Sequence, residues 1–259
     1  MIHSTDQLGR ILSFTEVPKR IISCVPSQTE LLYDLGLDES VVGITKFCIH
    51  PTEWFRNKTR IGGTKNLDIA KIKSLKPDLI IANKEENTRE QLEELMLDYP
   101  VWISDVKDLE EAGQLIIGLG NLLNRSNEAK QMHGAITVQF SRLQPMHNKS
   151  CAYFIWKEPY MCVGHSTFIN HLLEKCGFIN CFKKSSRYPQ LLAAEITQAK
   201  PDLILLASEP FPFKTNDIAH FETICPNSKV ILVNGEAFSW YGSRLLKSVD
   251  YFEELLKTI

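Results

Sequence analysis

Long apolar runs and an excess of charge of one sign are both missing from this sequence of 259 residues. No stretch approaches the roughly 18–20 apolar residues that a transmembrane helix needs, so we expect no membrane insertion. The 29 Lys and Arg residues balance 31 Asp and Glu residues, which argues against a broad surface for nucleic acid or anionic lipid. Because 44% of the residues are apolar and 23% are charged, the chain can form a packed core and is not globally disordered.

Closely spaced cysteine pairs are missing as well. The seven cysteines are scattered and form no C-x-x-C motif, so we expect free thiols in a reducing compartment and no structural zinc site. Residues 1–11 contain no basic segment followed by an apolar run, which is the pattern of a secretory leader. The chain as written is therefore expected in the cytoplasm, or in the periplasm if its N-terminus has been trimmed.

Catalytic signatures are also absent. The sequence contains no G-x-x-x-x-G-K-S/T loop, no G-x-S-x-G elbow and no H-E-x-x-H motif. The glycine-rich segment 60–65 is too short for a dinucleotide fingerprint and predicts a turn. His165 and His171 are six residues apart and would face different sides of a helix, so the sequence identifies no metal site. We therefore expect a protein that is not an enzyme.

An internal repeat is the strongest positive signal. The motif K-P-D-L-I at residues 76–80 recurs at residues 200–204, and flanking identities keep the same offset. Each copy predicts a short amphipathic helix, a Pro-Asp turn and a buried strand. Two copies indicate two similar lobes and not a solenoid.

The predicted fold is α/β, with two similar lobes of mainly parallel sheet. Strands expected near residues 20–25, 41–44, 79–82, 101–103, 151–156, 203–207 and 230–233 alternate with helical stretches. Residues 109–143 have helical spacing and predict one long linking helix, with a break near 124–127 as the alternative. We therefore expect an N-terminal lobe at 1–106, a linking helix at 107–145 and a C-terminal lobe at 146–259, with a ligand cleft between the lobes.

Aromatic side chains follow several of the predicted strands. Loops at the carboxyl ends of parallel strands commonly line ligand sites, and aromatic rings there can stack on a large planar or apolar ligand. Lysine or arginine at the rim can meet carboxylates of that ligand. The candidates chosen on this basis are Phe47, His50, Lys65, Trp156, Tyr160, Tyr188, Trp240, Tyr241 and Arg244.

A strand at 20–25, a P-S-x-T-E helix start at 26–30 and the K-P-D-L-I segment, in this order, resemble the substrate-binding proteins of ABC importers for cobalamin, haem and ferric siderophores. The resemblance extends over about residues 20–255. It implies a ligand, cobalamin first and then haem or a ferric siderophore, between two lobes joined by a rigid helix, with no covalent cofactor. It also places Thr64 and Tyr188 where the cobalamin-binding members carry stacking tryptophans; tyrosine keeps that stacking surface and threonine loses it.

The same resemblance bears on partners. In these importers each lobe presents a surface glutamate to the membrane permease, but here Ala70 and Ala194 occupy those positions. Loss of both carboxylates would remove the charge pairing that guides docking. Glu85 and Glu209 form another symmetric pair that could replace them. We expect a monomer that binds a metal chelate, either docking on an ABC permease or acting as a cytoplasmic relative that does not dock.

One alternative from a different class remains. Cys24, Cys48 and His50 lie near predicted strand ends in the first lobe. If they cluster, the chain would be an enzyme, a metal-chelatase relative or a metallocluster protein on a similar two-lobed scaffold.

Overall fold

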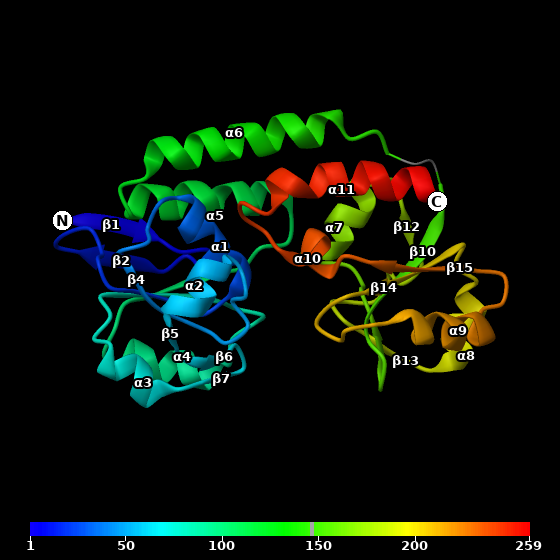
Figure 1. The fold of residues 1–259 in the computed structure, drawn as a ribbon, viewed down its shortest axis with the longest axis horizontal. Helices are drawn as coiled ribbons and strands as arrows, with labels where there is room; N and C mark the ends of the chain where they lie inside the picture. Colours follow the sequence, from blue (N-terminus) through cyan, green and yellow to red (C-terminus); the bar gives the residue numbers. More distant parts are fainter. Residues whose placement is uncertain (146–147) are drawn as a thin grey trace. The chain divides into compact units, whose positions relative to one another are not determined.

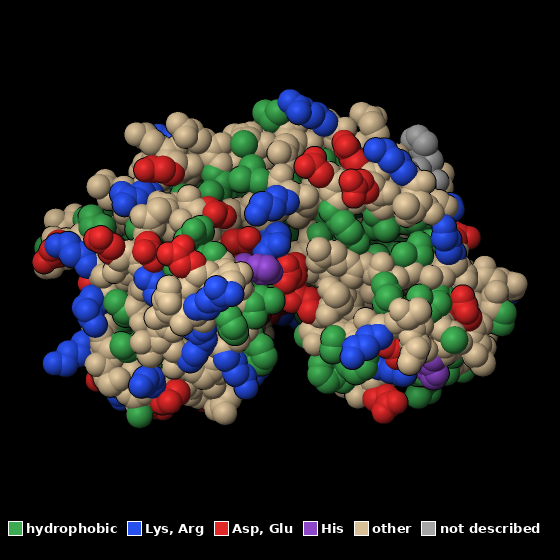
Figure 2. Space-filling model, in the orientation of Figure 1, with side chains coloured by type: hydrophobic (Ala, Val, Ile, Leu, Met, Phe, Trp, Pro, Cys, Tyr) green, Lys and Arg blue, Asp and Glu red, His purple; other side chains and the backbone are tan. Residues whose placement is uncertain are grey.

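The computed structural model describes residues 1–145 and 148–259 and divides into two compact units (Figure 1). Unit 1 contains Met1–Val106, Glu110–Val138 and Trp240–Leu246; unit 2 contains Lys107–Leu109, Gln139–Ser239 and Lys247–Ile259. Both units combine helices with mainly parallel sheet, so the predicted α/β class is confirmed. The acidic and basic side chains are interspersed on the face of each unit in Figure 2, as the balanced composition predicts.

The division differs from the predicted boundaries in two respects. Most of the predicted linking segment 107–145 is assigned to unit 1, as is the late segment Trp240–Leu246. The reason in the second case is that its side chains pack on the first third of the chain, as described below. The predicted boundary between residues 145 and 146 falls at residues 146–147, which lie outside the described residues.

Unit 1 is built on a five-stranded parallel sheet in the order β5-β4-β3-β8-β9. Its branched apolar residues are buried, as expected for strands covered on both faces. In Figure 1, α3 and α4 lie on the opposite side of unit 1 from α5. The strands are β5 (Thr59–Arg60), β4 (Val41–Ile44), β3 (Ile21–Ser23), β8 (Leu79–Asn83) and β9 (Val101–Ser104), and the connecting helices are α1 (Pro26–Asp34), α2 (Thr52–Asn57), α3 (Ile69–Ser74) and α4 (Arg89–Met96). A small hairpin, β6 (Gly62–Gly63) and β7 (Asn66–Leu67), follows β5.

An N-terminal hairpin, β1 (Ile2–Thr5) and β2 (Ile11–Phe14), adds to unit 1 and was not predicted. Its turn is organised by Asp6, whose buried carboxylate accepts hydrogen bonds from the backbone N–H groups of Leu8 (3.0 Å) and Arg10 (2.9 Å). The Gln7 N–H donates to the Ile103 carbonyl at 3.1 Å, which fastens the hairpin to β9.

The segment predicted as one long helix forms two, α5 (Leu109–Leu122) and α6 (Ser126–Arg142). The interruption lies at residues 123–125, next to the alternative break at 124–127. Asn124 adopts a positive φ of 54°, which asparagine tolerates better than most residues. A Cβ atom on Gly120 would lie 2.3 Å from the Ala129 Cβ, so this glycine allows the two helices to approach closely. No helix among the described residues is long and apolar enough to cross a membrane.

Unit 2 is built on a six-stranded sheet in the order β13-β11-β10-β14-β15, with β12 also paired to β10. Strands β12, β10, β14 and β15 run parallel, and β11 is antiparallel to its neighbours. The strands are β10 (Ser150–Trp156), β11 (Tyr160–Cys162), β12 (Ile179–Asn180), β13 (Gln190–Leu191), β14 (Leu203–Ala207) and β15 (Lys229–Val233), and the helices are α7 (Phe168–Lys175), α8 (Ala193–Ala199), α9 (Thr215–Ile224), α10 (Gly235–Ser239) and α11 (Leu245–Thr258).

The repeated K-P-D-L-I motif forms the same joint in both units. Lys76 and Lys200 each end a helix at a positive φ, 46° and 45°. Asp78 then accepts a hydrogen bond from the Arg20 N–H, and Asp202 accepts one from the Ser150 N–H, each at 2.8 Å. Each aspartate thus ties the repeated strand, β8 or β14, to the start of the central strand of its sheet. The prediction of two similar lobes is confirmed by this shared geometry.

Candidate functional site

The carboxyl ends of the parallel strands in unit 1 bring several predicted residues to one edge of the sheet. We call this the unit-1 edge; it comprises residues 45–50 after β4, 62–67 around the small hairpin and 84–88 after β8. Asn87 links the third loop to the second, since its Nδ2 donates to the Thr64 carbonyl at 3.0 Å and to the Cys24 carbonyl at 3.3 Å. The Lys46 N–H joins the first loop to the second by donating to the Gly62 carbonyl at 2.8 Å. Phe47, His50, Thr64 and Lys65 therefore lie in loops at the same edge.

Three predicted residues from the late segment Trp240–Leu246 join this edge. The Trp240 ring meets the His50 ring edge-on, with centroids 5.6 Å apart, and the Arg244 guanidinium lies 4.8 Å from the Trp240 centroid. Tyr241 Oη donates to Glu86 Oε1 at 3.4 Å. The sequence placed Trp240, Tyr241 and Arg244 in the C-terminal lobe, whereas they pack in unit 1. The reason is a set of long-range contacts that no local pattern encodes.

Arg244 anchors this segment. Its Nε donates to Glu30 Oε2 at 2.8 Å, and the Arg244 and Glu30 side chains are only 16% and 8% exposed. A buried ion pair of this kind must stay intact, because loss of one partner leaves a buried charge. The Arg244 guanidinium is therefore ion-paired with Glu30 in this structure.

Burial keeps the polar groups under the edge neutral. It raises the pKa of Tyr241 well above its usual value, and the Glu86 carboxylate adds to this effect. Burial also raises the pKa of Cys48 to about 11, although Thr29 and Thr45 hydroxyls lie 3.0 Å and 3.1 Å from its Sγ. Both side chains are thus protonated near neutral pH, and Cys48 is poorly suited to act as a nucleophile or metal ligand.

The alternative of a metallocluster or metal-dependent enzyme finds no support at this edge. Burial raises the pKa of the Cys24 thiol strongly, with the neighbouring Cys48 as a second cause. Over residues 1–145 and 148–259, no group of three or more His, Cys, Asp or Glu side chains could hold a metal ion. Cys24, Cys48 and His50 therefore do not form the cluster that this alternative needed.

Unit 2 carries aromatic side chains at the carboxyl ends of β10 and β14, which we call the aromatic ledge: the exposed Trp156, the half-buried Phe211 and the buried Phe213 beneath them. Trp156 is 39% exposed, and its ring meets that of Phe211 with centroids 5.6 Å apart. Phe211 packs in turn on Phe213 at 4.7 Å. Only Trp156 was predicted; the motif F-P-F at 211–213, directly after a predicted strand, is the signal that could have identified the other two.

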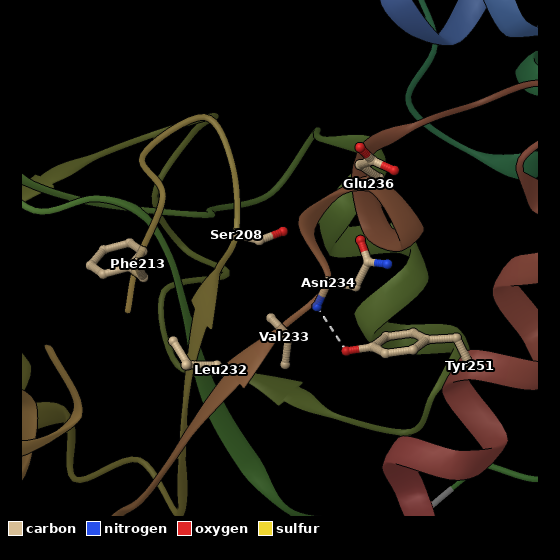
Figure 3. Close-up of a pocket in the computed structure, with 7 residues that line it drawn as sticks. All are labelled: Ser208, Phe213, Leu232, Val233, Asn234, Glu236 and Tyr251. Carbon is tan, nitrogen blue, oxygen red and sulfur yellow. Dashed lines mark hydrogen bonds between the residues drawn. The ribbon is translucent and has the colours of Figure 1, made fainter. Parts of the chain in front are cut away.

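A pocket of about 550 Å³ lies beside the ledge in unit 2 (Figure 3). Its apolar lining includes Phe213 and Leu232. Figure 3 shows the Tyr251 hydroxyl close to the backbone of Asn234, whose N–H donates to it at 2.8 Å. The lining residues are Ser208, Phe213, Leu232, Val233, Asn234, Glu236 and Tyr251, none of which was predicted from the sequence.

The remaining predicted aromatics of unit 2 lie apart from the ledge. Tyr160 stacks on His220 of α9, with its Oη 2.6 Å from His220 Nε2, and it lines a separate hollow of about 310 Å³ with Leu192. Tyr188 is half-buried and lies near the buried Tyr153 phenol, whose pKa is raised by burial first and then by Glu209 and nearby tyrosines. The ten predicted ligand residues therefore do not form one cluster: some lie at the unit-1 edge, Trp156 lies on the aromatic ledge, and Tyr160 and Tyr188 lie elsewhere in unit 2.

The residues considered for partner docking differ in exposure. Ala70 in α3 and Ala194 in α8 are exposed, whereas Glu85 and Glu209 are half-buried in the loops that follow β8 and β14. Glu209 Oε1 accepts a hydrogen bond from Ser239 Oγ at 2.7 Å. Both glutamates thus lie at the carboxyl edges of their sheets, where the candidate ligand residues also gather.

Comparison with known proteins identifies the group to which this architecture is related. A family model described as periplasmic binding protein matches residues 21–222. A vitamin B12-binding protein of Pectobacterium carotovorum is 25% identical over 241 residues, 89% of this chain and 85% of that protein. The periplasmic vitamin B12 binding protein of Vibrio cholerae superimposes with a TM-score of 0.75 at 23% identity, over 93% of this chain and 98% of that one. A periplasmic haem-binding protein of the same organism gives a TM-score of 0.78 at 16% identity, over 92% and 98%. At these identities the structural likeness shows a shared fold.

Proposed function

The chain belongs to the periplasmic binding protein family, and from this premise we propose that it binds a large metal chelate, namely cobalamin, haem or a ferric siderophore. It is a substrate-binding protein and not an enzyme. The proposed ligand class is supported by one observation: exposed aromatic side chains lie at the carboxyl ends of parallel strands in both units. Ligands of α/β proteins commonly bind at such edges.

Each unit carries its own candidate contacts to the ligand. At the unit-1 edge, Phe47 is 52% exposed, and His50 and Thr64 are half-buried beside it. In unit 2, the ledge offers Trp156, and Phe211 extends its surface. Flat apolar rings of this kind stack on the face of a corrin, a porphyrin or an aromatic chelator. We propose Phe47, His50, Thr64, Lys65, Trp156 and Tyr188 as direct ligand contacts, Tyr160 as a peripheral one, and Trp240, Tyr241 and Arg244 as residues that hold the unit-1 edge in shape.

An absorbance titration tests this function. Purified protein is titrated with cobalamin, haem and a ferric siderophore, and we expect the absorption bands of at least one of them to shift on binding. Phe47→Ala and Trp156→Ala should each weaken that binding about tenfold, because each removes a stacking surface. Phe55→Ala is the matched control, since Phe55 is 37% exposed on α2 and already covered by Arg60. Unchanged spectra with all three ligands would contradict the proposal.

We further propose that the protein works in a reducing compartment. We also propose that it does not dock on a permease through Ala70 or Ala194. The seven cysteines are free and six of them are buried, which supports a compartment that keeps thiols reduced. The exposed side chains of Ala70 and Ala194 carry no charge for a basic permease pocket. Glu85 and Glu209 are the residues that would have to replace them in any acid-mediated docking.

A further inference from the structure

The exposed ring of Phe47 contacts the small hairpin of unit 1. A Cβ atom built on Gly63 would be only 3.1 Å from Phe47 Cε2 and 3.4 Å from Lys46 Cε. The ring and the lysine stem therefore rest directly on the hairpin backbone, which a larger residue at position 63 would push away. The Lys46 N–H also donates to the Gly62 carbonyl at 2.8 Å. These contacts give the aromatic ring a fixed position although half of its surface is open.

One ammonium group lies over this ring, and a second is carried by the hairpin on which the ring rests. Lys46 Nζ lies 5.1 Å from the Phe47 ring centroid. Lys65, two residues after Gly63 on the same hairpin, donates its Nζ to the backbone carbonyl of Glu85. Both lysine side chains are exposed, and the Lys65 ammonium is held by a neutral acceptor. We call Lys46, Phe47, Gly63 and Lys65 the lysine platform.

Neither platform lysine is neutralised by a carboxylate in the part of the chain that the structure describes. Other lysines of unit 1 are neutralised in this way: Lys58 pairs with Asp38 at 2.8 Å, and Lys84 pairs with Asp105 at 2.7 Å. The nearby Glu86 carboxylate accepts its hydrogen bond from Tyr241, and Arg244 is committed to Glu30. Over the described residues, the platform thus combines an exposed aromatic ring with two ammonium groups that no carboxylate pairs with.

We infer that the ligand carries acid groups at the edge that meets the lysine platform. This inference rests on the proposed function and narrows it: an exposed aromatic ring with two ammonium groups on the same platform suits a planar, acid-bearing chelate, such as a porphyrin with carboxylates or a catecholate complex. Stacking on Phe47 and charge-assisted hydrogen bonds from Lys46 and Lys65 would act together. Glu85 and Glu86 at the same edge repel an acid group, so its favourable position is on the lysine side of the ring.

A titration with haem and with its dimethyl ester tests the inference. The ester keeps the macrocycle and the metal but converts the propionate carboxylates into neutral groups. We expect haem to bind about tenfold more tightly than the ester at low ionic strength, with a difference that shrinks as salt is added. Lys46→Ala/Lys65→Ala should remove this difference, whereas Lys46→Arg/Lys65→Arg should keep it. Lys71→Ala is the matched control, because Lys71 is an exposed lysine on α3 of the same unit.

The outcomes separate this inference from the function on which it rests. Equal affinity for haem and ester, or an unchanged preference in the double alanine variant, would overturn the inference and leave the proposed function in place. Tight binding of cobalamin with no binding of haem would do the same. Failure of the wild-type protein to bind haem, its ester, cobalamin or a ferric siderophore would overturn both.

Discussion

At the scale of single residues, the chemistry of the unit-1 edge depends on groups that are far apart in sequence. Phe47 and Lys65 of the platform were named from their residue type and loop position. Lys46 was not, because an exposed lysine has no distinguishing sequence pattern, and only the structure shows that no carboxylate pairs with it among the described residues. Phe211 was missed for a different reason: aromatic residues after a strand are as often core as surface, and only its contact with Trp156 separates the two.

The Glu30–Arg244 pair gives a prediction at this scale. Arg244→Met should lower the free energy of unfolding by about 3 kcal/mol, because it leaves the Glu30 carboxylate buried without its counter-charge. Adding Glu30→Gln to that variant should recover part of the loss. Urea denaturation measures both. Arg89→Met is the control, since the Arg89 side chain is 82% exposed and its surface pair with Glu93 should contribute less than about 1 kcal/mol. An Arg244→Met protein as stable as the wild type would contradict this account.

At the scale of elements, the longer buried strands of both sheets were predicted from apolar patterning, because buried parallel strands are continuous runs of branched apolar residues. The short strands β5, β11, β12 and β13 and the helices α2, α4, α9, α10 and α11 were not predicted. The interrupted helix at 109–143 was predicted only as an alternative, since its spacing continues through the turn. The N-terminal hairpin escaped prediction because its strands are short and half-exposed, and its stability comes from Asp6 and from contacts with β9.

Two helical glycines test the packing of α5 on α6. Gly120→Ala should destabilise the protein, because the added Cβ would overlap Ala129 at 2.3 Å. Gly134→Ala in α6 has open space around it and should stabilise the protein by about 0.5–1 kcal/mol through helix propensity. Thermal unfolding of the two variants should therefore shift in opposite directions. A Gly120→Ala protein at least as stable as the wild type would show that Gly120 is not at a close helix crossing.

At the scale of the whole molecule, the duplicated architecture was readable from sequence because the K-P-D-L-I joint recurs with its neighbours. Which segments belong to which unit could not be predicted, because Trp240–Leu246 is assigned to unit 1 through partners about 155 to 214 positions earlier. The local patterns on which sequence interpretation relies do not extend over such separations.

Transport provides the prediction at this scale. Glu85→Gln/Glu209→Gln should leave ligand uptake through a cognate importer unchanged, because the proposed mode of action does not use acid-mediated docking. Uptake is measured in cells that carry the importer, together with ligand affinity of the purified variant. Lost uptake with retained affinity would identify the two glutamates as docking residues and would reject a relative that does not dock.

The return of Trp240–Leu246 to unit 1 has a consequence for the order in which the protein matures on the ribosome. A nascent chain that has emerged only as far as α6 holds every strand of the unit-1 sheet but neither Arg244 nor Trp240. The Glu30 carboxylate therefore stays hydrated until Arg244 has been added to the chain and can pair with it. Unit 1 therefore cannot complete its packing until residue 246 has been added, although the last strand of its sheet ends at Ser104.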